Sequence, residues 1–273
     1  MPALMALADK TAVITGAAGG IGRAIALSLA RRGCHLALAD VNEAGLAETA
    51  KLIASNRLRV SRHRLDVADR AAVAAFPEVV VAEHSGVDIL VNNAGVALGG
   101  TFDDVSEEDF EWLFDVNFWG VVRMTRAFMP LLKSSTDARI VNVSSIFGII
   151  APAGQTAYSA SKFAVRGFSQ ALRHELEGTR IGVTVVHPGG VATSIADQAR
   201  VPKGTSAEDA ARRRELANKH LKMPPEKAGE IIVEAIERRR PRVLVGADAK
   251  GLSIIERIAP VSYWKILRRL QGD

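Results

Sequence analysis

The sequence predicts an α/β fold, in which helices cover both faces of a doubly wound parallel sheet of about seven strands. Short apolar runs rich in Val and Ile alternate with helical patterns along the whole chain. Several of these runs are apolar almost throughout, as expected for strands that are buried on both faces. The chain has 273 residues, of which 48% are hydrophobic. That is enough to build a single domain over residues 1–273.

The predicted elements follow one another in regular order. Strands are predicted at 11–15, 34–39, 58–63, 87–91, 138–143, 181–186 and 242–246. Helices fill most of the gaps, near 20–32, 42–55, 69–84, 106–133, 156–177 and 224–239. Right-handed crossovers bring the carboxyl ends of such strands to one edge of the sheet, where ligands bind.

A glycine-rich turn, TGAAGGIG (15–22), follows the first strand. Gly16, Gly20 and Gly22 leave the backbone free to approach a pyrophosphate, whose charge is favoured by the N-terminus of the next helix. A tight strand-to-helix turn would also use glycine. The strand before it, the helix after it and the acid that ends the second strand together predict a Rossmann-like dinucleotide site.

That acid is Asp40, in LALADVN. A carboxylate at this point accepts hydrogen bonds from both ribose hydroxyls of adenosine and repels a 2′-phosphate. No Lys or Arg lies within the glycine turn or directly after Asp40 to hold such a phosphate. The sequence therefore predicts NAD as cofactor, with NADP as the less favoured alternative. The competing interpretation is that Asp40 is only a helix cap or turn residue.

The ends of the third and fourth strands are also candidates for cofactor contacts. Asp66 could accept a hydrogen bond from the adenine amino group beside the Val67 backbone, while Asp69 is the better candidate for capping the next helix. NNAG (92–95) has small residues that let the backbone lie close to a ligand. An ordinary turn would use the same residues.

Tyr158 and Lys162, in AYSASKFAV, lie four residues apart, which places them on one helix face with small residues between them. A fixed cation near a phenol favours the phenolate and lowers the tyrosine pKa. Tyr158 could then exchange a proton with an alcohol or ketone. A chance pair on an amphipathic helix would look the same.

Other polar residues strengthen this hypothesis. Ser144 and Ser145 end the fifth strand, where a hydroxyl could hydrogen-bond a substrate oxygen. Asn117, in FDVNFWG, places an amide among apolar neighbours and needs partners if it is buried. It is either structural or holds a water that passes protons onward.

These motifs together resemble the short-chain dehydrogenase/reductase (SDR) family in its short single-domain form. TGAAGGIG, NNAG, VNFWG, VSS, YSASK and HPGG occur in the order of that family, closely over residues 8–195. The resemblance implies that Tyr158 is the catalytic acid/base and that Lys162 binds the nicotinamide ribose and tunes Tyr158. It also implies that Ser145, rather than Ser144, positions the substrate oxygen and that Asn117 holds a relay water.

The resemblance also implies the remaining cofactor contacts. Ile21 would flank the pyrophosphate, and Asn93 the nucleotide ribose. Pro188 and Gly189 would line the nicotinamide, and Thr193 would contact its carboxamide. The full predicted cofactor set is Gly16, Gly20, Ile21, Gly22, Asp40, Asp66, Val67, Asn93, Ala94, Gly95, Tyr158, Lys162, Pro188, Gly189, Val191 and Thr193.

The predicted function is an NAD-dependent oxidoreductase that interconverts a secondary alcohol and a ketone. Apolar residues follow the serines (146–152) and NNAG (96–98). They favour a hydrophobic alcohol or ketone as the small-molecule substrate. The alternative is a cofactor-bound scaffold or regulator that uses the basic C-terminal region, but the intact Tyr, Lys, Ser and Asn set argues for an enzyme.

Composition excludes several other classes. A single cysteine, Cys34, rules out an intramolecular disulfide and favours the cytoplasm; at the start of an apolar run it is expected to be a buried core thiol. MPALMALADK is no convincing signal peptide, and no apolar run is long enough for a transmembrane span. The six histidines form no metal-binding pattern, so no metal is predicted. No recognition module for nucleic acid is evident.

Two late segments have no fixed role. Residues 190–224 are polar and are expected to form a substrate lid with a helix near 206–221. Residues 247–273 are amphipathic, and could cover the pocket, contact another subunit or touch a membrane surface. Residues 200–273 hold 17 of the 35 Lys and Arg but only 10 of the 30 Asp and Glu. The family resemblance implies a homotetramer or homodimer built on the helices at 106–133 and 156–177.

Overall fold

One parallel sheet of seven strands forms the centre of the molecule. The structure is a computed structural model that describes residues 4–53, 55 and 57–271. The strand order is β3-β2-β1-β4-β5-β6-β7, and every pairing is parallel. The bounds are β1 Thr11–Thr15, β2 His35–Asp40, β3 Val60–Arg64, β4 Ile89–Asn92, β5 Ala138–Val143, β6 Ile181–Pro188 and β7 Arg242–Val245. The predicted doubly wound fold is confirmed, and each predicted strand is present within one or two residues of its expected ends.

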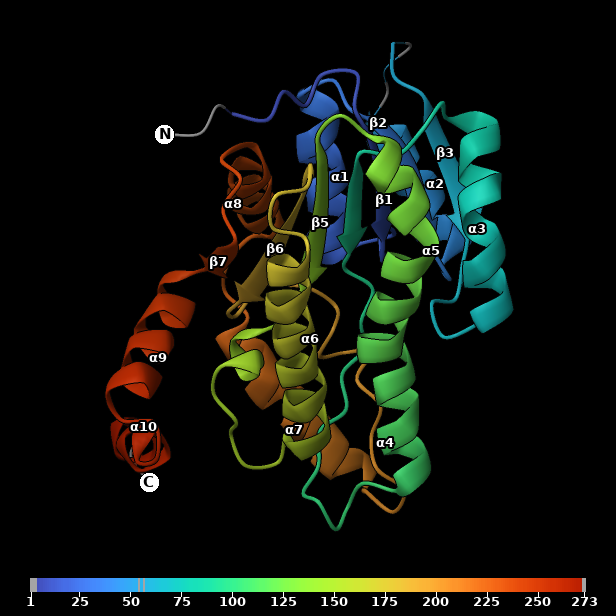
Figure 1. Ribbon diagram of the computed structural model, residues 1–273. Helices are drawn as coiled ribbons and strands as arrows, with labels where there is room; N and C mark the ends of the chain where they lie inside the picture. The colour runs from blue at the N-terminus through green and yellow to red at the C-terminus, as the bar shows by residue number, and fades with distance from the viewer. Residues whose placement is uncertain (1–3, 54, 56, 272–273) are drawn as a thin grey trace.

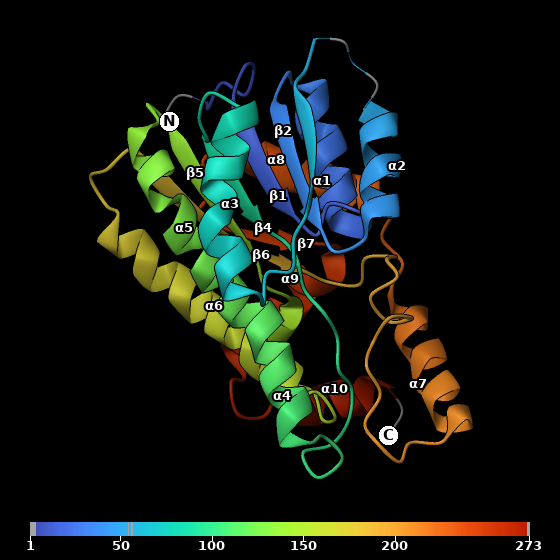
Figure 2. The same cartoon turned by 90° about the vertical axis from the view of Figure 1, so that its right-hand side faces the viewer.

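Six helices form the two outer layers (Figure 2). One face of the sheet is covered by α1 Gly20–Arg31, α2 Glu43–Ile53 and α8 Pro225–Glu237. The other face is covered by α3 Arg70–Glu83, α5 Gly120–Ser134 and α6 Thr156–Glu175. Each layer buries a separate apolar core against the central strands. Cys34 belongs to the first core and is fully buried, which confirms the predicted core thiol.

The predicted helix 106–133 is wrong in one respect, because it is interrupted. Ser106 caps α4 (Glu107–Phe114), accepting a hydrogen bond from the Asp109 amide at 3.2 Å. A π-helical turn, Asp115–Trp119, then joins α4 to α5. Such turns insert one extra residue into the helical repeat and often occur at functional sites. Here the turn contains Asn117, whose side chain is fully buried.

The remaining helices gather beyond the carboxyl ends of the strands (Figure 1). They are α7 Ala207–His220, α9 Ala247–Ile258 and α10 Tyr263–Gln271, with a short 3₁₀ turn at Ile146–Gly148. α7 lies close to the predicted bounds 206–221 and buries none of its residues. Among the described helices, none is both long and apolar enough to cross a membrane.

Candidate active site

The glycine turn has the shape that a diphosphate requires. Gly16 and Gly20 adopt the left-handed φ values of 67° and 52°. A Cβ atom at Gly22 would overlap the Gly16 carbonyl oxygen, so the turn can close only with glycine. Gly19 is the N-cap of α1 and supplies no side chain to the first helical N–H groups. These donors are therefore available to an anion.

Thr15 ties this turn to NNAG, although sequence reasoning did not select it. Its hydroxyl accepts hydrogen bonds from the Asn93 and Ala94 amides at 3.0 and 3.1 Å and donates to the Val91 carbonyl at 3.3 Å. The Asn93 side chain donates to the carbonyls of Thr15 and Gly16 at 3.0 and 3.1 Å. The end of β4 is thus held against the glycine turn.

Asp40 lies beside the same turn. One carboxylate oxygen accepts from the Ala18 amide and the other from the Asn42 amide, both at 3.0 Å. The cap at the start of α2 is Asn42, which accepts from the Gly45 amide at 3.0 Å. Asp40 is therefore not the cap of α2, and its carboxylate adds negative charge next to the predicted nucleotide site.

Asp66 and Val67 occupy different environments at the end of β3. Asp66 is exposed and accepts a hydrogen bond from the Ala68 amide at 2.9 Å. Val67 is buried against Gly120, where a Cβ atom would lie 2.8 Å from its side chain. Asp69 caps α3 by accepting from two amides, as predicted.

Tyr158 and Lys162 lie on successive turns of α6, facing the ends of β4 and β5. The Lys162 Nζ atom is 5.6 Å from the centroid of the Tyr158 ring and donates to the Val143 carbonyl at 3.3 Å. The Ser145 side chain lies close enough to the Tyr158 hydroxyl to lower the pKa of Tyr158. The structure thus brings together the three residues predicted from VSS and YSASK.

The direction of the Tyr158 shift differs from the sequence-based expectation. Desolvation raises the pKa of Tyr158 to about 12, and the lowering effect of the nearby Ser145 side chain offsets only part of that rise. Desolvation also lowers the pKa of Lys162 to about 8, because its ammonium group is removed from water. For both side chains, burial outweighs the attraction between the phenolate and the cation.

Asn117 is held next to this pair by its π-helical turn. Its Oδ1 atom accepts from the Val96 amide at 2.8 Å, and its Nδ2 atom donates to the Val96 carbonyl at 3.0 Å and to Ser161 Oγ at 3.2 Å. A Cβ atom at Gly95 would lie 3.1 Å from Asn117 Oδ1 and 3.3 Å from Lys162 Nζ. Ser161, one of the small residues of YSASK, is therefore an orienting partner that sequence reasoning missed.

Ser144 and Ser145 have different surroundings. The Ser144 hydroxyl is buried and donates to the Lys162 carbonyl at 2.8 Å, which commits it to packing against α6. Ser145 is half-buried and caps the 3₁₀ turn, accepting from the Phe147 amide at 3.1 Å. The buried His187 ring donates from Nδ1 to the Ser145 carbonyl at 2.9 Å, and desolvation lowers the pKa of His187 to about 4.

The HPGG turn approaches the glycine turn from β6. Val191 is buried, and the Thr193 methyl group would lie 3.0 Å from a Cβ atom at Gly20. The Gly190 amide donates to the Asp248 carboxylate at 2.7 Å, and a Cβ atom at Gly189 would overlap that carboxylate. No local sequence signal marks Asp248, which reaches the turn from the start of α9.

Comparison with known proteins identifies this arrangement. The sequence model described as short chain dehydrogenase matches residues 10–203. The chain belongs to the short-chain dehydrogenase/reductase family. The predicted resemblance is confirmed, and the protein is an oxidoreductase of the SDR type.

Relatives extend the likeness along almost the whole SDR chain. The Mycobacterium tuberculosis protein named oxidoreductase SadH is 45% identical over 261 residues, covering 94% of each chain. An SDR structure from Burkholderia phymatum in complex with NAD has a TM-score of 0.87 at 31% identity, covering 94% of this chain and 95% of that one. A short chain dehydrogenase from Mycobacterium paratuberculosis bound to NAD has a TM-score of 0.76 at 26% identity, covering 88% and 97%.

The segment after the HPGG turn is anchored at its base and along its length. The Gly190 carbonyl accepts from the Lys222 and Met223 amides at 3.0 and 2.9 Å, and the Ala192 amide donates to the Met223 carbonyl at 2.8 Å. Farther along, the Arg200 guanidinium lies 3.6 Å from the centroid of the Trp112 ring and binds Asp109 at 2.7 Å. The segment therefore rests on α4.

The C-terminal helices of this SDR protein pack on the residues that follow Ser145. Tyr263 Oη accepts a hydrogen bond from the Ala151 amide at 2.9 Å. One small apolar cluster joins the loop after β5 to α9 and α10, through Ile146, Ile149, Ile150, Ala249 and Leu267. Within the described part of the chain, no group of three or more His, Cys, Asp or Glu side chains is placed to hold a metal ion.

Proposed function

We propose that the protein is an NAD-dependent dehydrogenase that interconverts a hydrophobic secondary alcohol and the corresponding ketone. The main support for this proposal is that Tyr158, Ser145 and Lys162 lie together beside the glycine turn and the HPGG turn. A desolvated phenol beside a serine hydroxyl is suited to proton exchange with an alcohol oxygen.

Each polar residue of the site has a distinct task in this proposal. Tyr158 takes the hydroxyl proton during oxidation and returns it during reduction. Ser145 donates a hydrogen bond to the substrate oxygen, where charge develops. Lys162, below its pKa of about 8, supplies the cation that favours the phenolate. Asn117, oriented by Val96 and Ser161, holds the water through which protons leave the site.

The bound cofactor would accept or supply the hydride. The residues present fit such a cofactor. The first N–H groups of α1 have no side-chain cap, and the glycine turn and the HPGG turn lie close together at Gly20 and Thr193. Its diphosphate would lie on the glycine turn, and its adenosine ribose against Asp40. For the other residues of the predicted cofactor set, we propose the contacts that the family resemblance implies.

NAD is preferred over NADP in this proposal because of Asp40. The nearby Arg23 guanidinium is committed to Glu48 at 2.9 Å and to carbonyls of the glycine turn and α2. It therefore does not offer an open site for a 2′-phosphate. We expect NADH to raise the melting temperature at a lower concentration than NADPH does. Asp40→Asn should narrow that difference, and stronger stabilisation by NADPH in the wild type would contradict the assignment.

A hydrophobic substrate is favoured by the side chains around Tyr158. Phe147 meets the Tyr158 ring edge-on with centroids 6.1 Å apart, and the half-buried Val96 shares an apolar cluster with Tyr158. We propose that α9 and α10 cover the substrate site beside Tyr158, since Tyr263 already binds the loop that follows Ser145. Turnover of a panel of aliphatic secondary alcohols and polyols with NAD tests this point, and faster turnover of polyols would refute it.

A homodimer or homotetramer is proposed on the outer face of α5 and α6. Trp119 and Phe163 are 48% and 38% exposed there, and a second subunit would cover both side chains. Light scattering of the wild type and Trp119→Glu tests the interface. A wild-type monomer would contradict it.

A further inference from the structure

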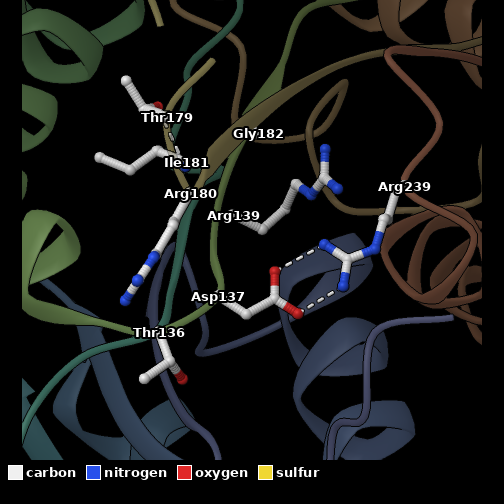
Figure 3. A pocket seen from close by; sticks show the side chains of 8 residues that line it. All are labelled: Thr136, Asp137, Arg139, Thr179, Arg180, Ile181, Gly182 and Arg239. Atoms are coloured by element: carbon white, nitrogen blue, oxygen red, sulfur yellow. Dashed lines mark hydrogen bonds and ion pairs between the residues drawn. The ribbon is translucent and has the colours of Figure 1, made fainter. Parts of the chain in front are cut away.

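A cavity of about 410 Å³ lies at the opposite end of the sheet from the candidate active site. It is lined by Thr136, Asp137, Arg139, Thr179, Arg180, Ile181, Gly182 and Arg239 (Figure 3). These residues precede or begin β5 and β6, or follow α8, whereas Ser145 and Pro188 lie at the carboxyl ends of the same two strands. The cavity is therefore separate from the dinucleotide site.

Arg139 stands where the fold calls for an apolar residue. Alternate residues of a strand share one face, and Val141 and Val143 on this face belong to the core beneath α1 and α8. Arg139 is only 5% exposed, and its Nε atom has no hydrogen-bond partner within the part of the chain that the structure describes. A buried cation that lacks full compensation is costly.

The neighbouring strand is shaped around this guanidinium. Gly182 of β6 pairs with Arg139 in the sheet register, and a Cβ atom at Gly182 would overlap the guanidinium. Glycine inside a strand often marks the close approach of another group. The cationic side chain is thus given room by a residue that weakens the strand.

The charges around the cavity are not balanced. Asp137 is the acid of the lining, and both of its oxygens bind Arg239 at 2.6 Å (Figure 3). Arg139 and the exposed Arg180 add two further positive charges. Desolvation and the positive charge of Arg239 lower the pKa of Arg139 to about 10, which is still well above neutral pH. The cavity consequently carries a net positive charge with a carboxylate that is already engaged.

We propose that this cavity is a binding site for a phosphate group, either inorganic phosphate or the terminal phosphate of a small phosphomonoester. Guanidinium groups bind phosphate through paired N–H donors, and Thr136 lines the same space. The Thr179 hydroxyl already donates to the Leu176 carbonyl at 2.7 Å, so the arginines are the donors of the site. The volume exceeds that of phosphate alone and leaves room for an attached organic group. The site does not depend on the proposed dehydrogenase function.

Calorimetric titration with inorganic phosphate at constant ionic strength tests the site. We expect saturable binding by the wild type, at least fivefold weaker binding by Arg180→Ala, and none by Arg139→Met. Gly182→Ala keeps every charge but displaces the guanidinium, so it should also weaken binding. Arg62→Ala removes an exposed arginine from β3, on the far side of the sheet, and should bind as the wild type does.

Two results would overturn the proposal. One is the absence of saturable phosphate binding by the wild type; the other is equal binding by the wild type, Arg180→Ala and Gly182→Ala, which would place the phosphate elsewhere, as on the glycine turn. Arg180→Ala keeps the test valid if Arg139→Met fails to fold, because Arg180 is exposed. Glycerol 3-phosphate, with glycerol as the uncharged control, separates the two sources: tighter binding than phosphate assigns a phosphomonoester, and equal or weaker binding assigns the free ion.

Discussion

The Lys162 ammonium group lies 5.6 Å from the centre of the Tyr158 ring, and both side chains have pKa values displaced towards their neutral forms. The proposed acid/base and its proposed cationic partner are therefore both disfavoured as ions where they lie. Desolvation is the common cause, since it acts against either charge. A further positive charge in the site would be needed to make the phenolate accessible near neutral pH.

The first prediction concerns Tyr158, the proposed catalytic acid/base. Tyr158→Phe should lower kcat/KM by about 10²–10⁴-fold while leaving NADH affinity nearly unchanged, because the ring remains and only the acid/base group is lost. Tyr263→Phe is the matched control, since these are the two tyrosines of the chain. A Tyr158→Phe variant with wild-type turnover would contradict the assigned role.

The same variant makes the tyrosine pKa measurable. The ultraviolet difference between wild type and Tyr158→Phe isolates the ionisation of Tyr158. Without cofactor, we expect no phenolate from this residue below about pH 10, in line with its raised pKa. Added NAD⁺ should shift the titration to lower pH. A phenolate near pH 8 in the cofactor-free protein would show that burial does not dominate.

The second prediction is that Lys162 costs stability. Its pKa falls from an ordinary 10.5 to about 8, which corresponds to roughly 3 kcal/mol of unfavourable burial of the charged form. Lys162→Met should raise the free energy of unfolding at pH 7 by about that amount and lose activity. Lys133→Met, at an exposed position of α5, should change neither the free energy of unfolding nor the activity by much.

The pH dependence of stability offers a second test of the buried Lys162 charge. Between pH 8 and 10.5 the unfolded chain binds more protons at this residue than the folded protein does, so stability should rise with pH across that window. Lys162→Met should lack this part of the rise. Denaturant unfolding of both proteins at several pH values measures it, and identical profiles would refute the argument.

The third prediction concerns His187, which is neutral and fully buried beneath Ser145. Its pKa is lowered from 6.5 to about 4, so the unfolded chain binds more protons between these values. Stability should therefore be present above pH 6.5 and fall by on the order of 3 kcal/mol as pH approaches 4.

His187→Asn tests this contribution, because an asparagine amide can still donate to the Ser145 carbonyl but does not titrate. The variant should lose less stability between pH 6.5 and 4 than the wild type. His174→Asn, at an exposed position, serves as control. Equal acid sensitivity of wild type and His187→Asn would argue against a neutral buried imidazole.

The fourth prediction concerns the segment that rests on α4. Arg200→Ala removes both the ion pair with Asp109 and the stacking on Trp112, and should raise the substrate KM several-fold with a smaller effect on kcat. Arg200→Lys should be intermediate, since it keeps the charge and loses the planar stack. Arg212→Ala on the exposed α7 is the control. Faster limited proteolysis of residues 193–221 in Arg200→Ala would accompany the change, and an unaltered KM would oppose a lid function.

Much of the fold is predictable because the strands are buried on both faces and therefore read as continuous apolar runs. The break between α4 and α5 is not, since a π-helical turn adds one residue without removing the helical pattern around it. Its amide residue, Asn117, was selected from sequence as a polar group in apolar surroundings, and the structure supplies its partners.

The candidate site also combines features that local sequence predicts with features that depend on the tertiary fold. Gly16, Asp40 and Tyr158 lie within local motifs, and the structure brings each to the expected edge of the sheet. Asp248 reaches Gly190 only because α9 folds back over the end of β6, a contact between residues 58 positions apart. The Tyr158 pKa likewise depends on how much water its neighbours exclude, a property that no spacing of residues encodes.

The hydrogen bonds that join Gly190 and Ala192 to Lys222 and Met223 bring the two ends of a long excursion side by side. The segment between them, which rests on α4 and includes α7, therefore begins and ends at almost the same point. Such an excursion can be exchanged for one of another length at small entropic cost, because the ends stay fixed. The fixed ends make residues 193–221 a segment that could be replaced by grafting or varied by directed evolution. Such changes could adapt the proposed site to new alcohols while the sheet stays unchanged.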